Sequence, residues 1–154
     1  MSATGAIERV PFAEAKDNLS RFVSVVVRQH LPRILERQGE GPLLALPVAD
    51  MGRALSRLHF DARVTFGDSV IVTLPQFGLV ASGADLDQAI DALTAELTEY
   101  ATDFFSDFDY YRHTERVTHF PWLLRFGLTA APERRSLLLG EMPVAEEALT
   151  AATS

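Results

Sequence analysis

Three aspartates in the second half of the chain are the residues best suited to metal chemistry. Asp103, Asp107 and Asp109 stand at the end of a predicted helix, and clustered carboxylates can hold the divalent ion of a nuclease. The stretch is short and polar, and no Glu or His is placed to complete a ligand set. His113 and His119 lie six residues apart and also lack a carboxylate at metal-site spacing. We therefore expect no metal and no catalytic residues here.

The sequence also lacks the other residue types and motifs that commonly support catalysis. The chain has no Cys, which excludes disulfides, thiolate metal sites and a Cys nucleophile. Gly39-Glu40-Gly41 is not followed directly by a helix, so we interpret these residues as a tight turn and not as a phosphate loop. No nucleophile pairs with a base in the sequence. The chain is predicted to be no enzyme and to need no cofactor.

Composition indicates a folded protein outside the membrane. The chain has 154 residues, of which 47% are hydrophobic, enough for one ordinary domain or two very small ones. No apolar run approaches the roughly 20 residues that cross a bilayer. The N-terminal segment lacks both the basic part and the apolar core of a secretory signal. These features predict a cytoplasmic protein.

Charge is distributed unevenly along the chain, whose net charge is −7. Residues 1–63 have nine basic and seven acidic side chains, whereas residues 64–154 have five basic and fourteen acidic ones. A mildly basic front half suits a polyanion, and a strongly acidic back half suits a basic protein surface. The alternative is that the acidic residues only form a solvated surface.

The front half alternates between strand and helix patterns. Ile7 to Val10 is a short β-prone run ended by Pro11, a residue that suits a first helical turn. Apolar residues then recur at intervals of three and four, which predicts a helix with one buried face: Phe12, Ala15, Leu19, Phe22 and Val26. Pro32 ends this helix, a β-hairpin turns at 39–41, and helical spacing returns at 49–58. The predicted order is β-α-β-β-α.

These residues resemble the Phd/YefM family of antitoxins. The matching pieces are Ala15 to Ser20, the turn from Arg37 to Gly41, and Leu44 to Asp50. The resemblance covers residues 1–58, although Lys16 stands where an Arg is usual.

The Phd/YefM resemblance implies a homodimer or higher oligomer that presents basic residues to operator DNA. The candidates for DNA contact are Arg9, Lys16 and Arg21. So few charges give weak, salt-sensitive phosphate contacts in one copy, which is why a dimer would be required. The alternative reading is that they are ordinary solvated charges.

The back half begins with alternating strands and continues with a long helix. Apolar and polar residues alternate over 60–66 and 70–74, a third strand is predicted at 79–81, and a helix at 86–105. Asp85 and, three residues later, Gln88 have the types of a capping box at the start of that helix. This β-β-β-α order, with Gly83 to Ala89 opening the helix, resembles the small HicB-like antitoxin unit over residues 59–105. The predicted class is α+β: a Phd/YefM-like unit, then a HicB-like unit with a helical C-terminal extension.

Residues 106–127 combine aromatic side chains with Arg, a composition that protein interfaces favour. The candidate toxin contacts in this segment are Tyr110, Tyr111, Phe120, Trp122 and Phe126. The alternative is that these aromatics are core residues packed against the sheet. The last segment, 128–154, is predicted to be a tail that is flexible or binds a partner.

The predicted domains are therefore 1–58 for dimerisation and DNA binding, 59–127 for a HicB-like unit with an aromatic extension, and 128–154 for the tail. Both resemblances imply an antitoxin of a type II toxin–antitoxin system. Such a protein binds its toxin directly and represses its own operon. An acidic inhibitor suits a basic, RNA-directed toxin, such as a RelE-like or HicA-like ribonuclease. The alternative is a stand-alone dimeric transcriptional regulator without a toxin.

Overall fold

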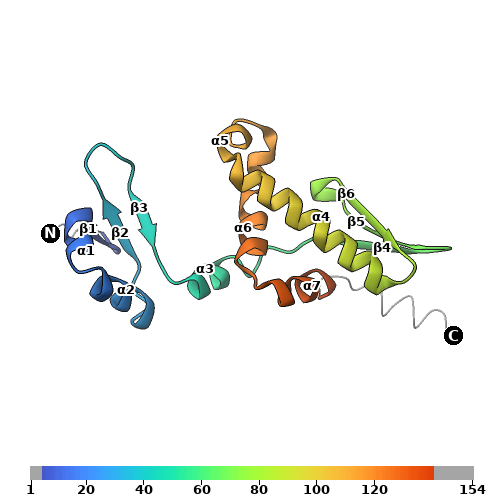
Figure 1. Cartoon of the computed structure of the whole chain (residues 1–154), viewed down its shortest axis with the longest axis horizontal. Helices are drawn as coiled ribbons and strands as arrows, with labels where there is room; N and C mark the ends of the chain where they lie inside the picture. Colours follow the sequence, from blue (N-terminus) through green and yellow to red (C-terminus); the bar gives the residue numbers. More distant parts are fainter. Residues whose placement is uncertain (1–4, 141–154) are drawn as a thin grey trace. The chain divides into compact units, whose positions relative to one another are not determined.

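The structure is a computed structural model in which residues 5–140 are described (Figure 1). The chain divides into two compact units, with unit 1 ending at Ala54 and unit 2 beginning at Leu55. Each unit combines a three-stranded sheet with helices, which confirms the predicted α+β class.

Unit 1 is a small mixed sheet with three helices. Its elements are β1 (Glu8–Pro11), α1 (Phe12–Asp17), α2 (Leu19–Arg28), β2 (Arg33–Glu36), β3 (Leu43–Ala45) and α3 (Val48–Ala54). Strand β2 lies in the centre, parallel to β1 and antiparallel to β3. A parallel pair requires a crossover connection, which α1 and α2 provide. Gly39, with φ of 85°, lies in the turn of the β2–β3 hairpin, as predicted.

The helix predicted from Phe12 onward is broken at Asn18. This residue leaves helical conformation, with φ of −139° and ψ of 61°, and separates α1 from α2. Asn is a weak helix former, and the continuous apolar spacing across it gave no sign of the break. Pro11 was predicted to lie in the first helical turn. In the structure it is the last residue of β1 and directly precedes the first residue of α1.

The predicted apolar face of these helices is only partly buried. Ala15 and Val26 are buried, but Phe12 and Leu19 are 39% and 59% exposed. The prediction of one fully buried face is therefore wrong for the single chain. Val10 and Pro47 are the other buried residues within the described part of unit 1. A core of this size is too small to stabilise such a unit well by itself.

Unit 2 consists of an antiparallel sheet covered by helices. Its elements are β4 (Arg63–Phe66), β5 (Val70–Leu74), the 3-10 turn η1 (Pro75–Phe77), β6 (Leu79–Gly83), α4 (Leu86–Ser106), α5 (Phe108–Tyr111), the 3-10 turn η2 (Glu115–His119), α6 (Phe120–Leu128) and α7 (Ala131–Leu139). The predicted meander is confirmed, with β5 between β4 and β6. Helix α4 packs against β5 and β6 on one side and against α6 and α7 on the other (Figure 1).

The predicted cap and extent of the long helix are confirmed. The Asp85 carboxylate accepts a hydrogen bond from the Gln88 backbone N–H at 2.8 Å. The Gln88 side chain accepts one from the Ala84 backbone N–H at 3.1 Å. These bonds satisfy backbone donors that the first helical turn leaves without partners.

The core of unit 2 lies between the sheet and α4 and extends to α6 and α7. Alternate residues of β5 and one face of α4 are buried, together with residues of the later helices: Val70, Val72, Leu74, Ile90, Leu93, Leu97, Phe104, Leu123, Phe126 and Leu138. Both the two-residue period of the strand and the helical period of α4 were visible in the sequence. Across residues 5–140, no helix is long and apolar enough to span a membrane.

Gly83 is required where β6 meets the start of α4. A Cβ atom added at Gly83 would lie 2.5 Å from the Ala89 backbone nitrogen and 2.6 Å from the Gln88 Cβ. We expect Gly83→Ala to lower the free energy of unfolding by about 2 kcal/mol, because backbone atoms must move to relieve this overlap. Urea denaturation would measure the change. Gly67→Ala is the control, because a Cβ there meets only the Ser69 carbonyl oxygen at 3.8 Å; equal losses would contradict the prediction.

Part of the predicted C-terminal tail is an ordered helix. The Arg135 guanidinium on α7 pairs with Asp91 at 2.9 Å and with Asp87, and Leu138 is fully buried. These contacts attach α7 to α4. The rest of the predicted tail, residues 141–154, lies outside the described residues.

Candidate partner-binding surfaces

The three residues predicted to contact DNA do not form one cluster in unit 1. Arg9 extends from β1 and forms an ion pair with Glu36 of β2. Because Arg9 neighbours the buried Val10 in the strand, it lies on the opposite face of the sheet. Lys16 is exposed on α1.

Arg21 lies on the helix side of the sheet, in a surface hollow of mixed charge. The acidic side chains that line this hollow with Arg21 are Glu8, Glu14 and Asp17. Arg33 lines it too and pairs with Glu8 at 3.3 Å. A phosphate placed here would meet carboxylates as well as guanidinium groups, which weakens attraction to DNA at this point.

A second apolar stripe on α2 escaped the sequence prediction. Leu19, Val23 and Val27 are spaced four residues apart and are 59%, 48% and 51% exposed. This spacing places the three side chains on one helical face. The four-residue spacing of these residues is visible in the sequence. It overlaps with the predicted buried face at 12, 15, 19, 22 and 26, which shares Leu19 with it. Leu43 and Leu44 of β3 are also exposed.

The five predicted toxin contacts differ greatly in accessibility. Tyr110 is 61% exposed and Phe126 is fully buried. Tyr111, Phe120 and Trp122 are half-buried and pack against the core of unit 2. Phe126 therefore has a core role, and Tyr110 alone of the five has most of its side chain on the surface.

The half-buried aromatics surround a contact between Tyr100 and His119. The Tyr100 hydroxyl lies 2.6 Å from His119 Nδ1, and the Phe77 ring meets the imidazole edge to face, 4.8 Å between centroids. Burial lowers the pKa of His119 below its ordinary value, and the nearby Arg116 cation lowers it further. His119 thus links η2 to η1 and α4 in surroundings that disfavour its protonated form.

Unit 2 is expected to lose stability as pH falls below about 6.5, the ordinary pKa of an unfolded His. Since the folded state holds the pKa of His119 lower, the unfolded chain binds the proton first and is favoured through that window. His119→Gln should reduce the difference between urea midpoints at pH 7.5 and 5.5. His113→Gln, at an exposed position, is the control. An unchanged difference in the His119 variant would contradict this role.

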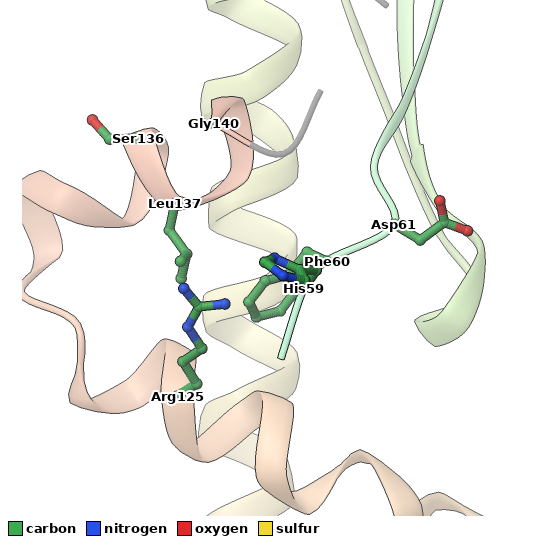
Figure 2. A pocket seen from close by; sticks show the side chains of 7 residues that line it. All are labelled: His59, Phe60, Asp61, Arg125, Ser136, Leu137 and Gly140. Atoms are coloured by element: carbon green, nitrogen blue, oxygen red, sulfur yellow. The ribbon is translucent and has the colours of Figure 1, made fainter. Parts of the chain in front are cut away.

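Two side chains of α6 hold the chain where it enters unit 2. The Trp122 indole N–H donates to the His59 carbonyl oxygen at 3.0 Å, and the Arg125 guanidinium donates to the Leu58 carbonyl oxygen. Beside them is an open hollow of about 590 Å³. In Figure 2 the Arg125 side chain reaches toward His59 and Phe60, whereas Asp61 and Ser136 point elsewhere. The polar groups that line the hollow therefore do not converge as catalytic groups would.

An acidic stripe runs along the outer face of α4. Glu96, Glu99 and Asp103 are exposed and spaced three and four residues apart, so they share one face of the helix. Within residues 5–140, no ion pair joins any of the three to a basic side chain. The described residues also contain no group of three or more His, Asp or Glu side chains placed to hold a metal ion.

Comparison with known proteins gives a consistent result. Residues 6–138 match the model of a PHD-like family described as antitoxins of toxin–antitoxin, RelE/RelB systems. A crystal structure from Syntrophomonas wolfei subsp. wolfei is similar, with a TM-score of 0.74 and 27% identity, over 88% of this chain and 96% of that one. That protein is described as an antitoxin part of a proposed toxin/antitoxin system. No curated protein matches the chain.

The family match spans both units, so it includes the small sheet of unit 1 as well as the core of unit 2. Antitoxins regulate and do not catalyse, in agreement with the prediction that the chain is no enzyme. The chain belongs to the PHD-like family of antitoxins of toxin–antitoxin systems.

Proposed function

We propose that this antitoxin neutralises its toxin by stoichiometric binding through unit 2 and represses its own operon through a dimer of unit 1. The observation on which the proposal rests is the contrast between the units. Unit 2 has a complete core and an unpaired acidic stripe at Glu96, Glu99 and Asp103. Unit 1 buries few hydrophobic residues and leaves the stripe Leu19, Val23 and Val27 exposed on α2.

The acidic stripe favours a toxin with a basic active surface. A ribonuclease binds the RNA backbone with Lys and Arg, and carboxylates placed over those cations exclude RNA by competing for them. The pairing of RelE with RelB in the family description supports a RelE-like ribonuclease as the toxin. A HicA-like ribonuclease also requires a basic surface to bind RNA and would fit the acidic stripe equally well. Tyr110 supplies an exposed aromatic side chain on the same unit, of the type that interfaces favour. Tyr111, Phe120 and Trp122 would support this surface from beneath.

The exposed stripe Leu19, Val23 and Val27 favours self-association of unit 1. Apolar residues at four-residue spacing on one helix pack well against the same residues of a second copy, because a two-fold axis makes the stripe complementary to itself. Burial of both stripes would supply the apolar area that the core of one copy lacks.

Dimerisation would also bring two sets of basic residues to one DNA molecule. Arg9, Lys16 and Arg21 contribute few charges in one copy, and Arg9 is already paired with Glu36. Two copies on a two-fold operator would double the phosphate contacts. Lys16 is exposed and forms no ion pair with any other described residue, which makes it the strongest of the three candidates.

Co-purification with the protein encoded next to this chain tests the toxin proposal. Both are produced together, with a tag on the neighbour alone. We expect the two to elute together and this chain to restore growth of cells that make the neighbour. If this chain forms a homodimer that does not bind the protein encoded next to it, although that protein is toxic, the proposal is overturned and a stand-alone regulator is favoured.

An electrophoretic shift on the chain's own upstream DNA tests repression. We expect retardation that weakens steeply as salt rises, because phosphate contacts release counterions. Lys16→Ala should weaken the shift, whereas Ser82→Ala in unit 2 should leave it unchanged. Absence of any shift, with the toxin present or absent, would overturn DNA binding.

A further inference from the structure

A small apolar hollow lies between α4 and the end of α6 in unit 2. It has a volume of about 260 Å³ and is lined by Thr98, Thr102 and Phe105 of α4 and by Gly127 and Arg134 from the later helices. Pockets for small molecules begin at roughly 300 Å³. The hollow therefore suits a single apolar side chain of a larger partner better than a free ligand.

The threonines present methyl groups to this hollow. The Thr98 hydroxyl donates to the Thr94 carbonyl oxygen at 2.7 Å, and the Thr102 hydroxyl donates to the Thr98 carbonyl oxygen at 2.8 Å. Because each hydroxyl is satisfied within the helix, it needs no partner from outside. The α4 wall is therefore apolar although it includes two threonines.

The opposite wall is held in place by contacts within unit 2. The Arg134 guanidinium lies over the Phe126 ring, 4.7 Å from its centroid, and Arg134 Nε donates to the Thr129 carbonyl oxygen at 3.1 Å. Phe105 also lines the hollow and is 39% exposed. A hollow with fixed walls loses little entropy when a side chain enters it.

Acidic side chains border the apolar wall along its length. Glu99 and Asp103 directly follow Thr98 and Thr102 in α4, so they lie about 100° around the helix from them. Both are exposed, and no described basic side chain forms an ion pair with either. An occupant of the hollow would place its flanking residues beside two carboxylates.

We propose that the hollow is the anchor site for a basic segment of the toxin, which inserts one apolar side chain between α4 and α6 and places Lys or Arg beside Glu99 and Asp103. This proposal rests on the proposed function, because it assigns a docking site to the toxin. Charge complementarity favours the toxin over a second copy of unit 2 as the occupant. A second copy would bring its own acidic stripe beside Glu99 and Asp103, and the like charges would repel.

Site-specific photocrosslinking tests the occupant. The chain has no Cys, so Gly127→Cys provides one thiol for a maleimide-linked photocrosslinker in the full chain. The substitution is compatible with the fold, since a Cβ at Gly127 comes no closer than 4.0 Å to Phe105. Ser82→Cys, on the sheet face that α4 leaves uncovered, is the matched control. We expect irradiation of the complex with the neighbour-encoded protein to crosslink the Gly127 variant and not the Ser82 variant.

Other outcomes would overturn the assignment. A crosslink from position 127 to a second copy, or to residues 141–154 of the same chain, would identify a different occupant. Equal crosslinking at both positions would indicate no specific site. If the neighbour-encoded protein does not bind the unmodified chain at all, the proposed function fails, whereas normal binding without a crosslink at 127 refutes only the anchor site.

Affinity measurements give a second readout. Gly127→Trp fills the hollow from its rim and should weaken toxin binding by about tenfold or more, as expected for loss of a central anchor. Asp103→Lys should weaken binding strongly at low salt and less at high salt. Asp68→Lys, in the β4–β5 turn, makes the same change in net charge as its control. Equal effects at 68 and 103 would mean that only overall charge matters and would overturn the role of the acidic border.

Discussion

Val23→Glu is expected to separate the proposed unit 1 dimer into monomers. Val23 is the middle residue of the exposed stripe with Leu19 and Val27, and a carboxylate there would be buried against its own symmetry mate. Such burial costs about 3 kcal/mol or more, which raises the dissociation constant of the dimer by about a hundredfold. Light scattering after size exclusion would measure the molar mass over a range of concentrations.

Ser20→Glu is the matched control for this change, because it adds the same charge to an exposed position of α2 outside the stripe. The chain's single Trp, Trp122, lies in unit 2, so its fluorescence would show whether unit 2 remains folded in both variants. Monomer formation by Val23→Glu alone, with normal fluorescence, is the expected result. A Val23→Glu variant that stays dimeric would exclude this stripe as the interface.

Phe104→Ala is expected to cause the largest loss of stability in unit 2. Phe104 has no exposed surface, and its ring lies 5.1 Å from that of Tyr111 and 5.4 Å from that of Phe108, measured between centroids. Removal of a buried Phe leaves a cavity and costs about 3 to 5 kcal/mol. Urea denaturation followed by Trp122 fluorescence would measure the free energy of unfolding.

The adjacent Phe105 provides the control for Phe104. It is 39% exposed, so Phe105→Ala removes less buried area and should cost about 1 kcal/mol. The same variant should weaken toxin binding if the hollow is the anchor site, whereas Phe104→Ala should act through stability alone. Equal losses of stability at the two positions would contradict the burial of Phe104.

The capping of α4 and the meander before it could be predicted because both are local properties. Asp85 and Gln88 bond to backbone groups within four residues, and the alternation of β5 depends on a period of two. The helix break at Asn18 is also local, but the apolar spacing on both sides of it fits a continuous helix. Periodicity records which faces are apolar and does not record where the backbone leaves the helix.

The sequence by itself determined the class of secondary structure, the start of α4, the uneven charge and the resemblance to antitoxins. Only the tertiary structure decided that Phe126 is buried while Tyr110 is exposed, and that Thr98, Phe105 and Gly127 share one hollow. The physical reason is that burial stabilises aromatic side chains both in a protein core and in a protein interface, so the residue type alone does not distinguish the two. Their burial depends on residues far away in the chain, such as His59, whose carbonyl accepts from Trp122, and so it cannot be read from local spacing.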